Sequence, residues 1–159
     1  MKNVFKLYIV LISIITMTSC GGMMSLTVLQ PELKSKIINV ENNNKQELFV
    51  KANNWMVETF NNAESVIQFT DKESGVVTGK YLMATIIKGT QVPSEYVYAI
   101  IKIRVKDNAA KIEINPSSYA NSYNPFAGGI SYPIEKANSE MELLITSFET
   151  VMQAEKDSF

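Results

Sequence analysis

Helical periodicity begins at residue 45. Apolar side chains recur every three or four positions over residues 45–60, which is the spacing of an amphipathic helix with one buried face. Asn44 precedes this stretch and Glu47 follows three positions later, a pattern that predicts a capping box at the start of the helix. Trp55 lies in the middle of the apolar stripe, so we expect it in the core. The stripe consists of Leu48, Phe49, Ala52, Trp55, Met56, Thr59 and Phe60.

After residue 60 the pattern changes to alternation. Ile67 and Phe69 are separated by Gln68, and residues 71–75 (DKESG) then supply turn chemistry, which predicts a hairpin. The returning strand covers residues 76–87, with Gly79 as a candidate bulge. Its alternation places Leu82, Ala84 and Ile86 on the core face and Tyr81, Met83 and Thr85 on the opposite face.

Residues 96–105 alternate most regularly. Because side chains of a strand point to opposite faces in turn, the apolar odd positions are predicted to face the core. They are Val97, Ala99, Ile101, Ile103 and Val105. The even positions then lie on the other face, and they are Tyr96, Tyr98, Ile100, Lys102 and Arg104.

The remaining segments complete an α+β fold. Strands are predicted at residues 36–40 and 111–115, and a polar, aromatic loop leads from residue 116 to a final helix of about 20 residues. The expected order is β-α-β-β-β-β-α. We expect a two-layer structure, an antiparallel sheet with helices on one face.

The N-terminus has the build of an export signal. Lys2 and Lys6 supply positive charge, and residues 4–15 are almost entirely apolar. A membrane-spanning helix needs about 20 apolar residues, whereas a signal-peptide core needs about 7 to 15. The segment therefore indicates a signal peptide over residues 1–19.

Cys20, the only cysteine, directly follows this segment. The stretch TMTSCGG resembles the lipobox of bacterial lipoproteins, although Met17 stands where that motif usually has leucine. The resemblance implies that Cys20 carries lipid, becomes the first residue of the mature chain and anchors the protein to a membrane. Two alternatives remain: a leftover thiol in an ordinary secreted protein, or an uncleaved anchor.

The predicted organisation is a signal peptide at 1–19, a lipidated N-terminus and tether at 20–35, and a single α+β domain at 36–157. Removing residues 1–19 takes away two of the 15 basic residues and none of the 16 acidic ones, so the net charge falls from −1 to −3. The lipobox resemblance implies the cell envelope. Gly21 and Gly22 follow the cysteine where an aspartate would mark retention in the inner membrane, which favours the outer membrane, facing the periplasm.

Residues 47–80, ELFVKANNWMVETFNNAESVIQFTDKESGVVTGK, resemble the start of a bacterial domain of unknown function, family 4468, whose fold is similar to that of the TATA-binding protein (TBP). The resemblance extends over residues 36–155. It implies an antiparallel, TBP-like sheet with helices on one face, and it implies no functional residues. Likeness of fold to a DNA-binding protein does not imply DNA binding.

Composition excludes several chemistries. The chain has no histidine, so a Ser-His-Asp triad, a Cys-His pair and a His-ligated zinc site are all excluded. No phosphate-cradling glycine motif occurs. We expect no cofactor, no metal and no enzymatic activity.

Two acidic pairs are the catalytic candidates that the sequence offers. Asp71 and Glu73 fall in the predicted turn, and Glu140 and Glu142 point to different sides of a helix because residues two apart do not face each other. The alternative function is a histidine-free hydrolase of envelope polymers, which would need a deep pocket with two carboxylates about 5 to 10 Å apart.

Nucleic-acid binding is not expected. Four basic residues are predicted to share one sheet face, Lys80, Lys102, Arg104 and Lys111, but Glu113 lies in the same row and the mature chain is acidic. We expect instead a non-enzymatic module that binds an envelope protein, peptide or glycan. The candidate surface is the sheet face away from the helices, with Tyr81, Met83, Tyr96, Tyr98 and Ile100. The loop at residues 119–132, or part of the tether, is the alternative occupant of that face.

Overall fold

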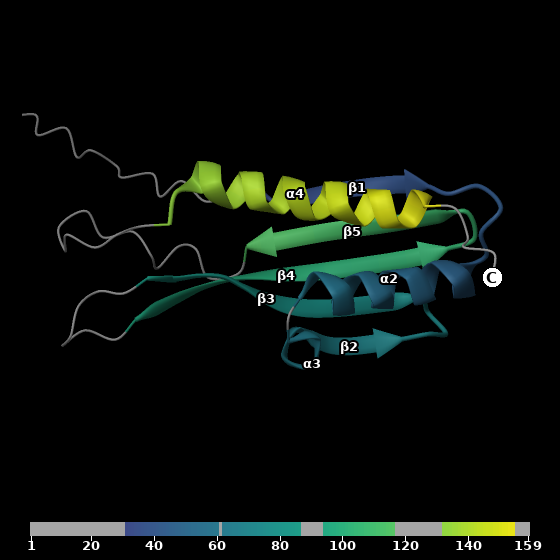
Figure 1. Ribbon diagram of the computed structural model, residues 1–159, viewed down its shortest axis with the longest axis horizontal. Helices are drawn as coiled ribbons and strands as arrows, with labels where there is room; N and C mark the ends of the chain where they lie inside the picture. The colour runs from purple at the N-terminus through teal and green to yellow at the C-terminus, as the bar shows by residue number, and fades with distance from the viewer. Residues whose placement is uncertain (1–30, 61, 87–93, 117–131, 155–159) are drawn as a thin grey trace, which may run out of the picture.

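One five-stranded antiparallel sheet organises the chain, which we describe from a computed structural model covering residues 31–60, 62–86, 94–116 and 132–154 (Figure 1). The strand order across the sheet is β1-β5-β4-β3-β2. The strands are β1 (Lys34–Asn39), β2 (Ile67–Asp71), β3 (Val76–Ile86), β4 (Glu95–Lys106) and β5 (Ala109–Pro116). The helices are α2 (Lys45–Thr59), α3 (Ala63–Val66) and α4 (Ile134–Gln153).

The two long helices lie on the same side of the sheet. In Figure 1, α4 runs along β1 and β5 while α2 crosses β3 and β4, and both helices also contact each other. The predicted fold class and the order of strands and long helices are confirmed. The short helix α3 was not predicted, because four residues are too few to show a period.

The start of α2 is fixed by its predicted cap. The Asn44 side chain accepts from the Glu47 amide over 2.9 Å, and the Glu47 carboxylate accepts from the Asn44 amide over 3.3 Å, so the capping box is present. Asp107, in the turn between β4 and β5, accepts from the Lys45 amide over 2.7 Å. These contacts tie the helix to the β4–β5 hairpin.

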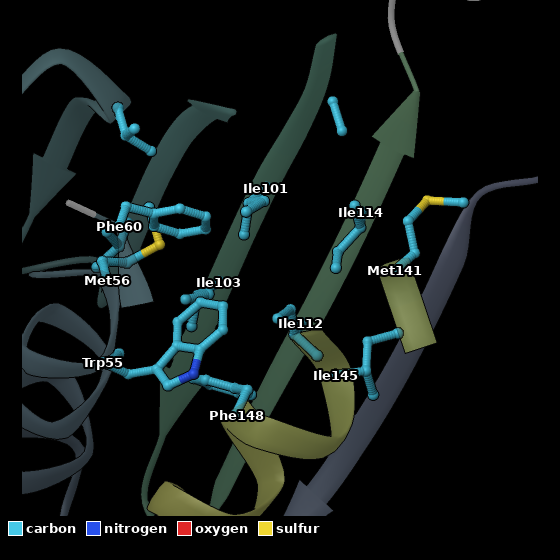
Figure 2. Close-up of a cluster of buried hydrophobic side chains, with 14 of the residues drawn as sticks. Trp55, Met56, Phe60, Ile101, Ile103, Ile112, Ile114, Met141, Ile145 and Phe148 are labelled. Atoms are coloured by element: carbon cyan, nitrogen blue, oxygen red, sulfur yellow. The ribbon is translucent and has the colours of Figure 1, made fainter. Parts of the chain in front are cut away.

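The core lies between the sheet and the two long helices. Figure 2 shows side chains of α2 and α4 directed at β4 and β5, with Trp55, Met56 and Phe148 above Ile101, Ile103 and Ile112. Trp55 is only 1% exposed, which confirms its predicted burial. The five odd positions of β4 are at most 6% exposed, so their predicted inward orientation is also confirmed.

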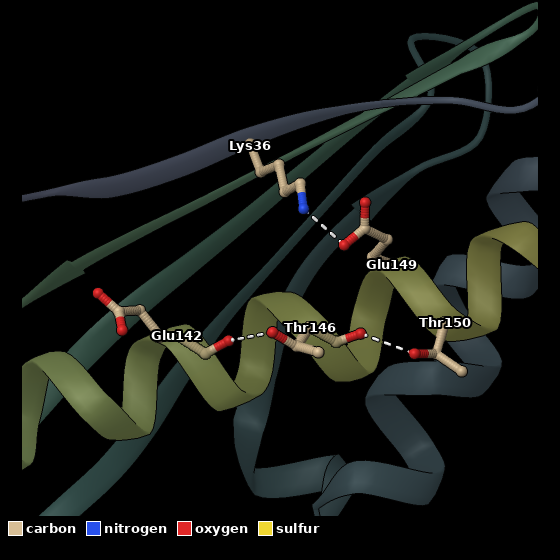
Figure 3. A network of polar contacts seen from close by, with 5 residues as sticks. All are labelled: Lys36, Glu142, Thr146, Glu149 and Thr150. Atoms are coloured by element: carbon tan, nitrogen blue, oxygen red, sulfur yellow. Dashed lines mark hydrogen bonds and ion pairs between the residues drawn. The ribbon is translucent and has the colours of Figure 1, made fainter.

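Ion pairs hold the edge strand β1 against α4. Lys36 reaches Glu149 over 2.5 Å, as Figure 3 shows, and Lys34 reaches Glu142 over 3.0 Å. Along α4, the hydroxyls of Thr146 and Thr150 donate to carbonyls four residues earlier. β1 begins at Lys34, two residues before the predicted strand, because Lys34 and Ser35 already pair with Ile114 and Glu113 of β5.

Within the described ranges, no helix combines the length and the apolar character that crossing a membrane requires.

Candidate binding surface

The sheet face away from α2 and α4 is here called the outer face. It is built on the even positions of β4, where Tyr96, Lys102 and Arg104 are exposed and Tyr98 and Ile100 are half-buried. Cross-strand register adds the partners of these residues on both neighbouring strands, because directly paired residues share a face. The added positions are Val76, Thr78, Lys80, Leu82 and Thr85 on β3, and Lys111, Glu113 and Asn115 on β5.

Two predicted members of this surface do not belong to it. Tyr81 pairs with the buried Ala99, and its ring contacts Phe60 with centroids 4.9 Å apart, so it faces the helices. Met83 is only 8% exposed. The outward placement of Tyr81 and Met83 was wrong, and Leu82, predicted in the core, is 42% exposed on the outer face.

A bulge in β3 explains the reversal. Leu82 pairs with Tyr98 and Ala84 pairs with Val97, so Met83 is an extra residue opposite a continuous stretch of β4. The inserted residue shifts the alternation by one position. Residues before it therefore have the opposite orientation from the one predicted, whereas Ala84 and Ile86 face the core as expected.

A second bulge lies in β2, opposite Gly79, and Gly79 itself is not the bulge that was predicted. The register shifts between Ile67 and Phe69, so the extra residue is Gln68 of β2. As a result Phe69 pairs with the outward Thr78 and is 55% exposed. Gly79 itself continues the ladder, where its missing side chain admits Met56 and the Val66 carbonyl.

The aromatic end of the outer face is formed by Tyr96 and Tyr98. Their ring centroids are 6.3 Å apart with a 33° angle between the planes. The Lys80 ammonium lies 4.0 Å from the centre of the Tyr98 ring, a distance at which the ring face attracts a cation. Leu82 and Thr85 lie beside the two tyrosines on β3. Leu82 was predicted on the core face because nothing in the apolar run of residues 81–84 indicates where the phase of the alternation changes.

The opposite end of the outer face is basic. Arg104 and Lys111 are paired across β4 and β5, and both bind the Glu113 carboxylate, Lys111 over 2.9 Å. The hydrogen bond from Lys111 and the positive charges of both residues hold the pKa of Glu113 below its usual value. Lys102 pairs directly with Glu113, so the four predicted basic residues do share one face, with one carboxylate among them.

A phenol on the helix side, that of Tyr81, interacts electrostatically with a carboxylate of α4. Burial raises the pKa of Tyr81, and the negative charge of Glu140 on α4 raises it further. One oxygen of Glu140, Oε2, is buried without a hydrogen-bond partner. The two groups repel each other when both are ionised, so this arrangement favours a protonated Tyr81.

The two acidic pairs weighed as catalytic candidates have the separate roles expected of them. The Asp71 carboxylate accepts from the amides of Glu73 and Ser74, and hydrogen bonds from Ser74 hold its pKa below the usual value. Glu142 binds Lys34, whereas the negative charge of Glu140 raises the pKa of Tyr81.

A hollow of about 510 Å³ lies between the β1–α2 connection and the end of α4. Most of its described lining residues carry amide side chains, and Glu41 is the acidic member. Across the described part of the chain, His, Cys, Asp and Glu side chains form no group of three that could hold a metal ion. Cys20, the predicted lipidation site, lies outside the described residues.

Residues 35–120 match the model of a protein family described as a domain of unknown function (DUF4468) with TBP-like fold. The chain belongs to this family. The match covers more than half of the chain and includes the α2 helix and all five strands, β1 from its second residue onward. A comparison with curated protein sequences finds no match.

Two solved structures resemble this DUF4468 chain. A TBP-like protein from Parabacteroides distasonis shares 14% identity with a TM-score of 0.56, over 78% of this chain and 94% of that one. A DUF4468 family protein from Bacteroides ovatus shares 11% identity with a TM-score of 0.54, over 83% of this chain and 94% of that one. At these identities the likeness shows the TBP-like fold alone.

Proposed function

We propose that this DUF4468 protein is a membrane-anchored envelope lipoprotein whose domain is a non-enzymatic binding module, with the outer face as its contact surface. The observation that carries the proposal is the difference between the two faces of the sheet. Helices α2 and α4 cover one face, while the other presents Tyr96, Tyr98 and Leu82 together at one end.

The chemistry of this end suits recognition. Tyrosine offers a broad apolar ring with a polar tip and few rotatable bonds, so ordering it on binding costs little entropy. Tyr96 is 51% exposed and Leu82 is 42% exposed, and both flank the Tyr98 ring. Neighbouring exposed apolar side chains of this kind typically mark an interaction site rather than scattered surface residues.

The sequence supports the anchor. Cys20 follows an apolar segment too short to span a membrane and lies in a stretch that resembles a lipobox. Acyl chains on one cysteine hold a soluble domain at a membrane without a crossing helix. A domain held in this way meets the proteins, peptides and glycans of the envelope, and the outer face is the surface that it offers to them.

Site-specific photo-crosslinking in intact cells tests the proposal. A photoreactive amino acid replaces Tyr96 on the outer face of the full-length lipidated protein, and the control carries it at Leu143, which is 66% exposed on α4. We expect crosslinked products from position 96 that are absent from position 143 and that disappear in the Tyr98→Ser background. Equal yields from both positions, or none from position 96, would remove the outer face as the contact surface.

A further inference from the structure

We infer that the ligand of the outer face is an acidic polysaccharide, a linear sugar polymer that carries carboxylates. This inference rests on the proposed function and specifies the partner of the same surface. It starts from the division of β4 into an aromatic half, Tyr96 to Ile100, and a basic half, Lys102 to Lys106.

Charge is distributed unevenly between the two sides of the molecule. The outer face holds five basic residues, Lys80, Lys102, Arg104, Lys106 and Lys111, although the whole chain has a net charge of −1. The helix α4 instead carries four glutamates and one lysine, and Lys34 and Lys36 of β1 pair with two of these glutamates, Glu142 and Glu149. The outer face is therefore the side with the clear excess of positive charge, to which an anionic polymer is attracted.

The partial neutralisation of these cations limits the charge density of the ligand. Glu113 lies between Arg104 and Lys111 and binds both, so two of the five cations are already paired. Lys80 lies against the Tyr98 ring, away from this network. The remaining positive charges are spaced apart, which matches a polymer with one carboxylate per sugar unit better than a nucleic-acid duplex, which carries one phosphate per about 1.7 Å of its axis.

The aromatic half supplies what a sugar ring needs. The face of a sugar ring is apolar at its C–H groups and its rim is polar, so it complements tyrosine rings that have a hydroxyl at one end. Lys102 and Arg104 continue the same row of β4 and offer charge-assisted hydrogen bonds to carboxylates. The outward positions from Tyr96 to Lys106 extend roughly 33 Å at the rise of an antiparallel strand, enough for several sugar units.

Other partners fit less well. The most exposed apolar side chains of the outer face, Ile37 on β1 and Phe69 on β2, lie on opposite edges with the charged rows between them. A membrane surface would require them to form one continuous apolar patch. The centre of the face is lysine-rich, whereas the cores of protein interfaces are depleted in lysine.

Affinity electrophoresis of the full-length protein in detergent tests the inference. The probes are polygalacturonate, which carries a carboxylate on each sugar, and the same polymer with its carboxylates methyl-esterified. We expect the acidic polymer to retard the protein. Esterification of the polymer should weaken binding roughly tenfold or more, and so should each of the double variants Lys102→Gln/Arg104→Gln and Tyr96→Ser/Tyr98→Ser. The matched charge control, Lys72→Gln/Lys136→Gln, removes two exposed cations away from the outer face and should bind as the unaltered protein does.

Three further probes separate this ligand from other anions: oligothymidylate, inorganic polyphosphate and phosphatidylglycerol vesicles. Binding of any of these as tightly as polygalacturonate overturns the inference, because it indicates unspecific attraction to anions. Undiminished binding of the esterified polymer, or of the Lys102→Gln/Arg104→Gln variant, also overturns it. If polygalacturonate fails while crosslinking from position 96 succeeds, the acidic-polysaccharide inference is wrong and the binding-module proposal stands. If both fail, both are wrong.

Discussion

Trp55 on α2 donates a hydrogen bond from its indole Nε1 to the hydroxyl of Ser147 on α4, over 3.1 Å. The same indole ring meets Phe148 edge-on at 5.1 Å and Phe60 at 5.9 Å between centroids. Trp55 therefore joins the two long helices to each other while it fills the space above the sheet. Substitution can therefore separate what the apolar packing of Trp55 contributes to stability from what its hydrogen bond to Ser147 contributes.

Replacing Trp55 by alanine should reduce the free energy of unfolding by roughly 3 to 5 kcal/mol, because a large aromatic site is emptied. Ser147→Ala removes only the hydrogen-bond acceptor and should cost about 1 kcal/mol. Denaturant unfolding followed by circular dichroism measures both. Native tryptophan fluorescence should remain that of a buried indole in Ser147→Ala. A spectrum typical of exposed indole in the unaltered protein would contradict the placement of α2.

Gly79 allows α2 and α3 to approach β3 closely. An added Cβ would lie 2.5 Å from the Met56 methyl group and 3.1 Å from the Val66 carbonyl oxygen. Met56 can turn aside but the carbonyl belongs to the backbone, so Gly79→Ala should destabilise the domain by about 1 to 3 kcal/mol. Thr78→Ala, on the outer face of the same strand, is the matched control and should cost less. Equal unfolding midpoints for the two variants would show that the contact is not tight.

The elements that the sequence predicted best are those with an unbroken period. In β4 every odd position from Val97 to Val105 is apolar, whereas the even positions are polar or aromatic apart from Ile100, so every inward position could be assigned from the sequence. The α2 helix had both a stripe of apolar residues and a capping box to mark its start. In each case a shift of the pattern by one residue would have turned the apolar side chains away from the core, so one assignment was clearly better.

The candidate surface was predicted only in part, and the reason is local. Residues 81–84, Tyr-Leu-Met-Ala, are apolar enough on both faces that either phase of alternation fits them. The extra residue at Met83 decides the phase, and it depends on pairing with β4 rather than on the residues of β3 alone. The bulge at Gln68 moved Phe69 outward for the same reason. Both strand irregularities are set by partners far away in the sequence.

Tyr81 should make the domain sensitive to alkaline pH. Its pKa is raised in the folded protein by burial and by the charge of Glu140, so the unfolded chain loses the phenolic proton first. Stability from this source is complete below about pH 10, the pKa of an exposed tyrosine, and is lost as the pH rises above it. Tyr81→Phe keeps the ring against Phe60 and should flatten this decline.

Urea midpoints measured between neutral and alkaline pH compare the two proteins. Glu140→Gln provides a second arm, because it removes the negative charge but leaves Tyr81 buried. The decline should still begin at about pH 10, but the total loss of stability should be smaller, because the pKa of Tyr81 in the folded protein is then raised by burial alone. Parallel stability curves for the unaltered protein and Tyr81→Phe would show that another group is responsible.

Cys20 should be the residue that anchors the protein. If it carries lipid, Cys20→Ser leaves no acceptor for the acyl chains, and the domain should either leave the membrane fraction or retain residues 1–19 unprocessed. Membrane fractionation and the intact mass of the purified protein distinguish these outcomes. Ser19→Ala is the matched control, since it changes the neighbouring position to another small residue and should preserve both lipidation and membrane attachment. A Cys20→Ser protein with unchanged mass, apart from the substituted atom, and unchanged membrane attachment would show that the anchor lies elsewhere.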